Sequence, residues 1–131
     1  MNRGAWLAGL LRVAALLPLP LAHAIGSALG WLLWRIPGNS PRTIAERNLS
    51  LCFPEWPAAE RDALLRQNLR ETGKLLLELG PLWFWTGERV LALVGRAVPG
   101  EEALATAVRQ KRGAILLTPH LGAWEMAGLH Y

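Results

Sequence analysis

The hydrophobic pattern is most continuous at the start of the chain. Residues 13–34 contain no side chain with a formal charge, and their only clearly polar side chains are His23 and Ser27. About 20 consecutive apolar residues are enough to cross the hydrocarbon core of a bilayer. We therefore expect residues 1–36 to be an N-terminal membrane anchor that contains a membrane helix.

Two prolines interrupt this apolar stretch. Pro18 and Pro20 predict a break into two helical pieces, near residues 5–17 and 21–35, because proline has no N–H to donate inside a helix. Two other interpretations stay open at this point. The stretch also fits a cleaved signal peptide, and it fits an apolar hairpin that is either buried or lies at a membrane surface without spanning the membrane.

Beyond the anchor the pattern changes to amphipathic helices separated by turn residues. A short basic helix is expected at about residues 42–51. The clearest helix is expected at about residues 58–79, where leucines recur at three-, four- and seven-residue intervals. Gly80 and Pro81 are expected to end it. Residues 88–94 fit either a short helix or a strand.

The last third of the chain combines a helix with a short apolar run. Residues 100–111 predict a helix that is capped by Gly113, and the run Ala-Ile-Leu-Leu at residues 114–117 predicts a buried parallel strand. A further helix is expected over residues 123–131. Because helix, strand, turn and helix is the order of an α/β unit, we expect a mostly helical α/β fold for residues 37–131.

Composition and charge narrow the classes of function. Hydrophobic residues make up 52% and charged residues 18% of the 131 positions, with seven Trp, which indicates contact with lipid or with a partner half that these residues do not include. The net charge is +4 and the pI about 10.2. No basic stripe with interleaved aromatics predicts a nucleic-acid partner, so anionic lipid headgroups or phosphorylated substrates fit better. The single Cys52 excludes an internal disulfide and a cysteine-based metal site.

A histidine and a glutamate five positions apart are the candidate catalytic pair. His120 follows the expected strand, where α/β sheets place their ligands, and Glu125 falls in the first turn of the next helix, where the dipole favours a carboxylate. A carboxylate that accepts one imidazole N–H leaves the other ring nitrogen free to take a proton from an alcohol. A purely structural histidine is the competing interpretation. No Gly-x-Ser-x-Gly motif, glycine-rich phosphate loop or metal-ligand set accompanies the pair.

An aromatic patch follows the long helix. Trp83, Phe84 and Trp85 are consecutive. Ordinary core packing explains such a patch, and so does contact with lipid or with an acyl chain. The sequence leaves both interpretations open.

Two blocks of the sequence resemble a known family. Residues 113–125, Gly-Ala-Ile-Leu-Leu-Thr-Pro-His-Leu-Gly-Ala-Trp-Glu, closely resemble the active-site block of the lipid A biosynthesis acyltransferases, the lauroyl and myristoyl transferases of Gram-negative lipopolysaccharide assembly. Ala123 departs from the family, in which Asn is common there. The resemblance covers essentially this whole chain but only the amino-terminal portion of the family. An upstream block also resembles the family, with Arg42, Ala45, Asn48, Leu49, Leu51, Cys52, Phe53, Pro54 and Glu55.

The resemblance implies an inner-membrane enzyme with its catalytic part on the cytoplasmic side. Such an enzyme moves a fatty acyl group from acyl carrier protein to a hydroxyl of a lipid A precursor, without a metal or organic cofactor. His120 takes the place of the general base and Glu125 that of its acidic partner. Trp83, Phe84 and Trp85 become candidates for the wall of an acyl-chain groove.

Two alternatives to this function stay open. Glycerophospholipid acyltransferases share the histidine-acid chemistry but often carry aspartate where this chain has Glu125, so the glutamate favours the lipid A branch. A catalytically silent, membrane-associated module is the second alternative. We also expect these 131 residues alone to be inactive, because the rest of the expected sheet and the donor site are absent from them.

Overall fold

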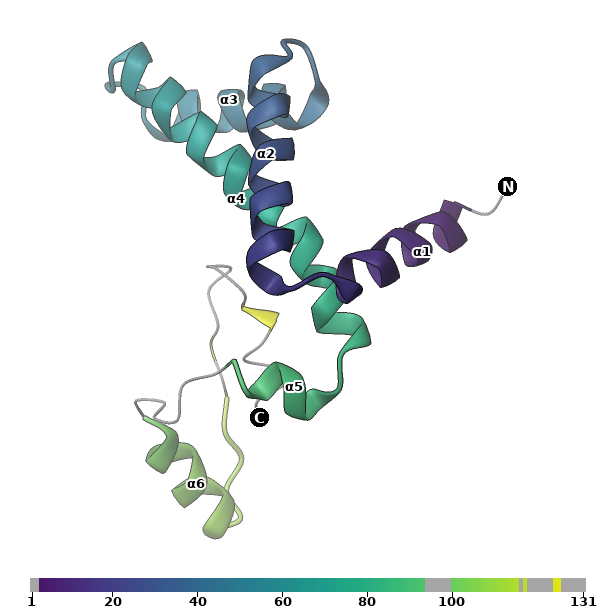
Figure 1. Ribbon diagram of the computed structural model, residues 1–131. Coiled ribbons are helices and arrows are strands. Elements are labelled where there is room, and N and C mark those ends of the chain that lie inside the picture. The colour runs from purple at the N-terminus through teal and green to yellow at the C-terminus, as the bar shows by residue number, and fades with distance from the viewer. Residues whose placement is uncertain (1–2, 94–99, 116, 118–123, 126–131) are drawn as a thin grey trace. The chain divides into compact units, whose positions relative to one another are not determined.

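The computed structural model describes residues 3–93, 100–115, 117 and 124–125 (Figure 1). The chain divides into two compact units, residues 1–85 and residues 86–131, and each is described by itself. Within the described residues every regular element is a helix: α1 (Arg3–Leu16), α2 (Leu19–Arg35), α3 (Ser40–Cys52), α4 (Ala58–Phe84), α5 (Gly87–Leu91) and α6 (Glu101–Arg109).

The apolar start of the chain forms two helices, as the prolines predict. Pro18 is the residue before α2, with the extended ψ of 137° that separates the helices. At 1.5 Å per residue, the 14 residues of α1 and the 17 residues of α2 extend over roughly 21 and 26 Å, less than the roughly 30 Å of a bilayer core. The predicted membrane helix is therefore not found: no helix among the described residues is long and apolar enough to span a membrane.

Helices α2 and α4 cross at buried glycines. A Cβ on Gly73 of α4 would lie 2.9 Å from the carbonyl carbon of Gly26 and 3.1 Å from the amide nitrogen of Gly30, both on α2. A Cβ on Gly30 would lie 2.6 Å from the Cα of Arg70. Because real Cβ atoms do not approach backbone this closely, only glycine permits the observed packing. Ala22, which is fully buried, continues the line of small residues along α2.

Helix α4 also packs on α1, and it continues past the predicted stop. A Cβ on Gly80 would lie 2.8 Å from the Cβ of Ala14, so glycine brings the two helices together here as well. Pro81 lies inside α4, which runs on to Phe84. The prediction of an end at residue 79 is therefore wrong. Pro81 is buried, and the packing of this last turn compensates for the backbone hydrogen bond that proline cannot make.

Helix α3 agrees with the short basic helix that the sequence predicts. The Oδ1 atom of Asn39 caps it by accepting from the backbone N–H of Arg42 at 3.0 Å. The loop between α3 and α4 is held by the guanidinium of Arg61, which donates to the carbonyl oxygens of Phe53 at 3.3 Å and Pro54 at 3.2 Å. A cation on α4 thereby binds carbonyls of the loop that follows α3.

The second unit contains α5 and α6. Of the two structures that fit residues 88–94, the short helix is confirmed by α5. The left-handed residue that follows α6 is Lys111, with a φ of +52°, and it lies two positions before the glycine that the sequence predicts for this place. The N–H groups of Lys111 and Arg112 donate to the carbonyls of Val108 and Ala107 at 3.0 and 2.9 Å, the pattern of a Schellman motif.

The predicted strand at residues 114–117 is not found. Ala114, Ile115 and Leu117 have no regular structure, and Ile115 and Leu117 are each 91% exposed. Leu116 lies outside the described residues. A parallel strand needs a hydrogen-bonded neighbour, and the described part of the chain contains no other strand. Of the expected α/β fold, the described residues confirm only the mostly helical character.

Candidate functional site

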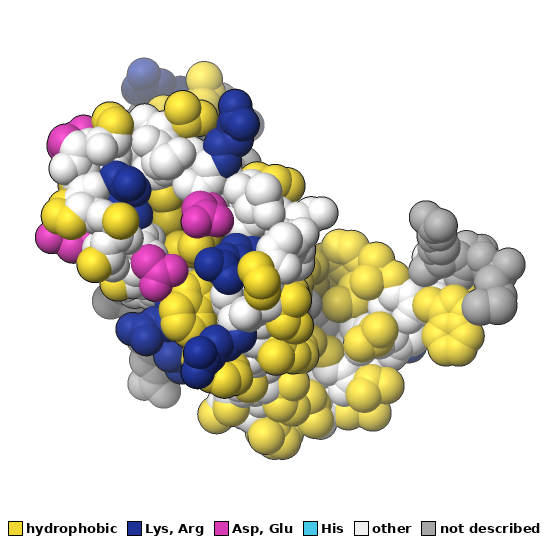
Figure 2. Space-filling view, turned by 90° about the horizontal axis from the view of Figure 1, so that it is seen from above, with side chains coloured by type: hydrophobic (Ala, Val, Ile, Leu, Met, Phe, Trp, Pro, Cys, Tyr) yellow, Lys and Arg dark blue, Asp and Glu magenta, His cyan; other side chains and the backbone are white. Residues whose placement is uncertain are grey.

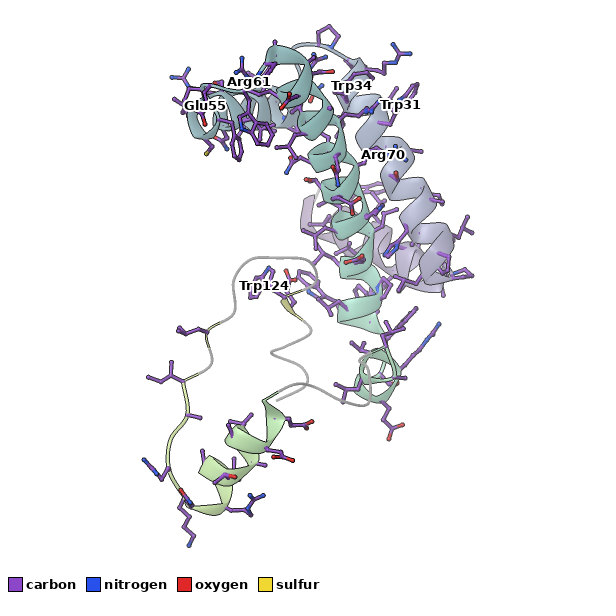
Figure 3. All side chains as sticks on the ribbon, turned by 90° about the vertical axis from the view of Figure 1, so that its left-hand side faces the viewer. Trp31, Trp34, Glu55, Arg61, Arg70 and Trp124 are labelled. Carbon is purple, nitrogen blue, oxygen red and sulfur yellow. The ribbon has the colours of Figure 1, made fainter. Side chains whose placement is uncertain are left out.

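The predicted catalytic pair is only partly within the described residues. Glu125 is helical and half-buried. Trp124 beside it, which is labelled in Figure 3, is exposed. Of the expected helix over residues 123–131, only Trp124 and Glu125 are described, so the place of the carboxylate in its first turn stays a prediction. His120 lies outside the described residues, so its pairing with Glu125 stays a prediction.

The three aromatic residues at the end of α4 have different environments. Trp85 is half-buried, and its indole Nε1 donates to the carbonyl oxygen of Ala15 at 2.7 Å, which ties α4 to α1. Trp83 is 63% exposed, and Phe84 has the guanidinium carbon of Arg12 at 5.2 Å from its ring centre. Trp85 therefore has a structural role, whereas Trp83 and Phe84 leave aromatic surface at this end of the helix.

Helix α1 adds an apolar surface that the helix pattern alone did not distinguish. Leu10 and Val13 are more than 60% exposed and Leu16 is 83% exposed, while Leu11 and Ala14 of the same helix are buried. Figure 2 shows hydrophobic side chains along this helix at the right of the view. Exposed apolar side chains of this size mark surfaces that contact lipid or another protein.

One edge of the α2–α4 crossing is polar and was not predicted. The indole Nε1 of Trp34 on α2 donates to Asp62 Oδ1 on α4 at 2.9 Å, and Arg70 Nε on α4 donates to Ser27 Oγ on α2 at 2.8 Å. Ser27 is buried, so the arginine satisfies a hydroxyl inside the apolar helix pair.

His23 belongs to the same edge. Its Nε2 atom lies 2.6 Å from Oε1 of Glu78 on α4, a close contact that lacks the direction of a hydrogen bond. The sequence places this histidine in an apolar helix with no plausible partner, and the fold supplies one. The contact gives His23 a structural role in joining α2 to α4.

Cations and indoles alternate at the end of α2. The guanidinium carbon of Arg35 lies 5.1 Å from the ring centre of Trp31 and 5.5 Å from that of Trp34, and the guanidinium carbon of Arg66 lies 5.6 Å from Trp34. Figure 3 shows Trp31 and Trp34 on α2 beside α4, with Arg70 further along α4. These contacts fix arginines that would otherwise be mobile.

The four-residue spacing of cations along α4 is the sequence signal that could have indicated this polar edge. Arg66, Arg70 and Lys74 recur every four residues and so share one side of the helix. The sequence predicts only that such residues face solvent. The attachment of Arg66 and Arg70 to α2 depends on the crossing of two helices that are about 40 positions apart in the chain.

The chain matches the family of bacterial lipid A biosynthesis acyltransferases over residues 2–130. It is 39% identical over 121 residues to a lipid A biosynthesis acyltransferase of Haemophilus influenzae, which covers 88% of this chain and 37% of that protein. It is 33% identical over 127 residues to the lipid A biosynthesis lauroyltransferase of Escherichia coli, with 96% and 40% covered. It is also 33% identical over 120 residues to the lipid A biosynthesis palmitoleoyltransferase of Escherichia coli, with 92% and 38% covered.

The chain spans roughly two fifths of the length of these relatives, and no solved structure matches it significantly. The family match includes both residues of the predicted pair and every described helix. The chain belongs to the bacterial lipid A biosynthesis acyltransferase family.

Proposed function

We propose that this chain is part of an enzyme that transfers a fatty acyl group from acyl carrier protein to a hydroxyl of a lipid A precursor. The observation that carries the proposal is the family match over residues 2–130, which contains His120 and Glu125. The relatives are named as lipid A biosynthesis acyltransferases, including a lauroyltransferase and a palmitoleoyltransferase, which supports acyl transfer in lipid A biosynthesis.

The proposed chemistry is a general-base acyl transfer. His120 takes the proton of the acceptor hydroxyl while Glu125 accepts the other imidazole N–H. The acceptor oxygen bonds to the thioester carbonyl carbon, the C–S bond breaks, and the departing thiolate takes the proton from His120. The net reaction moves the proton of the acceptor hydroxyl to the departing thiolate, and it requires no metal or organic cofactor. The half-buried, helical position of Glu125 suits a carboxylate that orients another side chain.

The aromatic end of α4 is proposed to contact the acyl chain through Trp83 and Phe84. Both side chains are exposed, whereas Trp85 is engaged with α1. Replacing Trp83 by Ala removes apolar contact area without opening a buried cavity. We expect the variant to raise the KM for a long-chain acyl donor more than that for a short-chain donor. Equal KM changes for both donors would remove Trp83 from the groove.

We place the chain at the cytoplasmic face of the inner membrane, and the exposed apolar surface of α1 supports the part of this proposal that concerns contact with a membrane. The chain is expected to float with phospholipid vesicles in a density gradient. Leu10→Glu with Val13→Glu places two charges on this surface and should leave the protein in the dense fraction. The control is Leu51→Glu on α3, where the leucine is 70% exposed. Flotation of the double variant with the vesicles would show that α1 is not the contact.

The transfer activity is tested in a chimera. This chain replaces the corresponding part of the Haemophilus influenzae relative, and transfer of a labelled acyl group to a lipid A precursor is measured, with glycerol phosphate as the competing acceptor. We expect transfer to the lipid A precursor, a loss of roughly 100-fold or more on His120→Ala, and a smaller loss on Glu125→Gln. Undiminished transfer by His120→Ala refutes the base assignment. A folded chimera that acylates only glycerol phosphate, or neither acceptor, refutes the proposed function.

A further inference from the structure

A row of cations follows α4 beside its crossing with α2. Arg66, Arg70 and Lys74, called the α4 basic row below, are spaced by four residues, or about 6 Å along the helix axis. Each side chain has a contact that holds it: Arg66 lies against the Trp34 ring, Arg70 donates to Ser27, and Lys74 Nζ lies 2.7 Å from Glu71 Oε1. The row is therefore preorganised.

The row retains positive charge after its local partners are counted. Among the described residues, Arg66 and Arg70 make no ion pair with a carboxylate, and Arg35 at the end of α2 makes none either. Glu71 neutralises Lys74, and the Asp62 carboxylate accepts from an indole N–H rather than from a guanidinium. A hollow of about 430 Å³ lies along this face, lined by Ala63, Leu64, Arg66, Gln67, Arg70, Glu71 and Lys74.

The row does not share the side of α2 that exposes most of its large apolar residues. Trp31, which is 42% exposed, is the exception, because it lies one helical turn from both Ser27 and Trp34. Ser27 accepts a hydrogen bond from Arg70, and the ring of Trp34 contacts Arg66. The exposed Leu29 lies two positions after Ser27, and the exposed Leu32 lies two positions before Trp34. Two positions correspond to about 200° around a helix, so the two sets point to nearly opposite sides. If the apolar side contacts lipid, the basic row faces away from that contact and stays accessible to a soluble protein.

We propose that the α4 basic row docks the acyl carrier protein through a helix on the carrier that presents carboxylates one turn apart. This inference rests on the proposed function, because it names the surface that receives the donor. Carboxylates at helical spacing would meet the cations at the same interval of about 6 Å. Complementary charges arranged in register accelerate encounter and set orientation, which suits a carrier that must bind and leave at every turnover.

The test measures direct binding. Fluorescently labelled acyl carrier protein is titrated with the 131-residue chain in detergent, and fluorescence anisotropy gives the Kd. Arg66→Glu with Arg70→Glu is expected to raise the Kd about tenfold or more, since it replaces attraction by repulsion at two positions. Arg47→Glu on α3, an exposed arginine outside the row, makes the same kind of charge change and should have little effect. Raising the salt concentration should weaken binding by the unchanged chain.

Exchanging the charges on the carrier distinguishes loss of the docking contact from misfolding of the variant chain. Lysine substitutions at acidic helix positions of the carrier should restore binding to the Arg66→Glu, Arg70→Glu variant. A milder Arg66→Gln, Arg70→Gln variant with unchanged circular dichroism should show an intermediate Kd. The inference is overturned if the carrier does not bind, or if Arg47→Glu weakens binding as much as the double variant. It is also overturned if the double variant no longer binds vesicles of anionic lipid but binds the carrier as tightly as the unchanged chain does.

The binding result and the transfer result are independent. Carrier binding that depends on Arg66 and Arg70, with no transfer by the chimera, would leave the docking surface in place and refute the proposed function. Transfer by the chimera, with carrier binding unaffected by the row, would refute the docking surface alone.

Discussion

The crossing of α2 and α4 is open to a direct test at Gly73. Alanine there would place its Cβ 2.9 Å from the carbonyl carbon of Gly26 and 3.1 Å from the amide nitrogen of Gly30. All of these neighbours are backbone atoms, which cannot rotate away as a side chain can. Gly73→Ala must therefore push the two helices apart or strain them.

The expected cost follows from three terms. Forcing a methyl group into a packed interface costs about 1–3 kcal/mol. Separating the helices also weakens the hydrogen bond from Arg70 to Ser27, which contributes about 1.5 kcal/mol because its donor is charged. Against these, alanine is the better helix former by about 1 kcal/mol. We expect Gly73→Ala to lower the free energy of unfolding by about 2 kcal/mol.

The measurement is urea denaturation followed by far-ultraviolet circular dichroism, with Gly9→Ala as the matched control. Gly9 lies inside α1, and a Cβ added there would have nothing within 4 Å of it, so the same substitution at this position should stabilise by up to about 1 kcal/mol. A Gly73→Ala protein as stable as the unchanged chain would refute the close crossing. So would an equal loss of stability in both variants.

Three further predictions concern local contacts. Lys111→Gly should stabilise α6 by about 1 kcal/mol, since glycine adopts the left-handed conformation without strain, whereas Gly113→Ala should change the stability little. Slower amide hydrogen exchange in α6 of the Lys111→Gly variant checks this prediction, and unchanged exchange contradicts it. Asn39→Ala removes the cap of α3 and should cost about 1 kcal/mol in urea denaturation, while Asn39→Asp keeps an acceptor and most of the stability. Trp85→Phe removes the hydrogen bond to Ala15 and should cost roughly 1 kcal/mol, and a neutral result would show that ring packing alone holds α4 to α1.

Much of the helical organisation was predictable from local pattern. The break at Pro18, the cap and extent of α3, and the start of α4 each depend on residues close in sequence. The same is true of the family resemblance, because a block such as residues 113–125 can be recognised without knowledge of its neighbours. His120 and Glu125 are predicted on this basis, and their mutual geometry stays a prediction.

Features that depend on distant partners could not be predicted in this way. The end of α4 was placed too early because Pro81 stops an isolated helix, whereas packing of Gly80 against α1 supports one more turn. The strand at residues 114–117 was predicted from its apolar pattern, but a strand also requires a neighbouring strand.

The sequence by itself determined which segments of this protein are helical, where most of them begin, and to which family the chain belongs, because capping residues, prolines and apolar periodicity act over a few positions. Only the tertiary structure decided which glycines meet, which side of α2 is left exposed, and that Arg66 and Arg70 are held against Trp34 and Ser27. The physical reason is that helix packing depends on how two helix surfaces fit together, and the sequence of one helix does not specify where the other helix will lie.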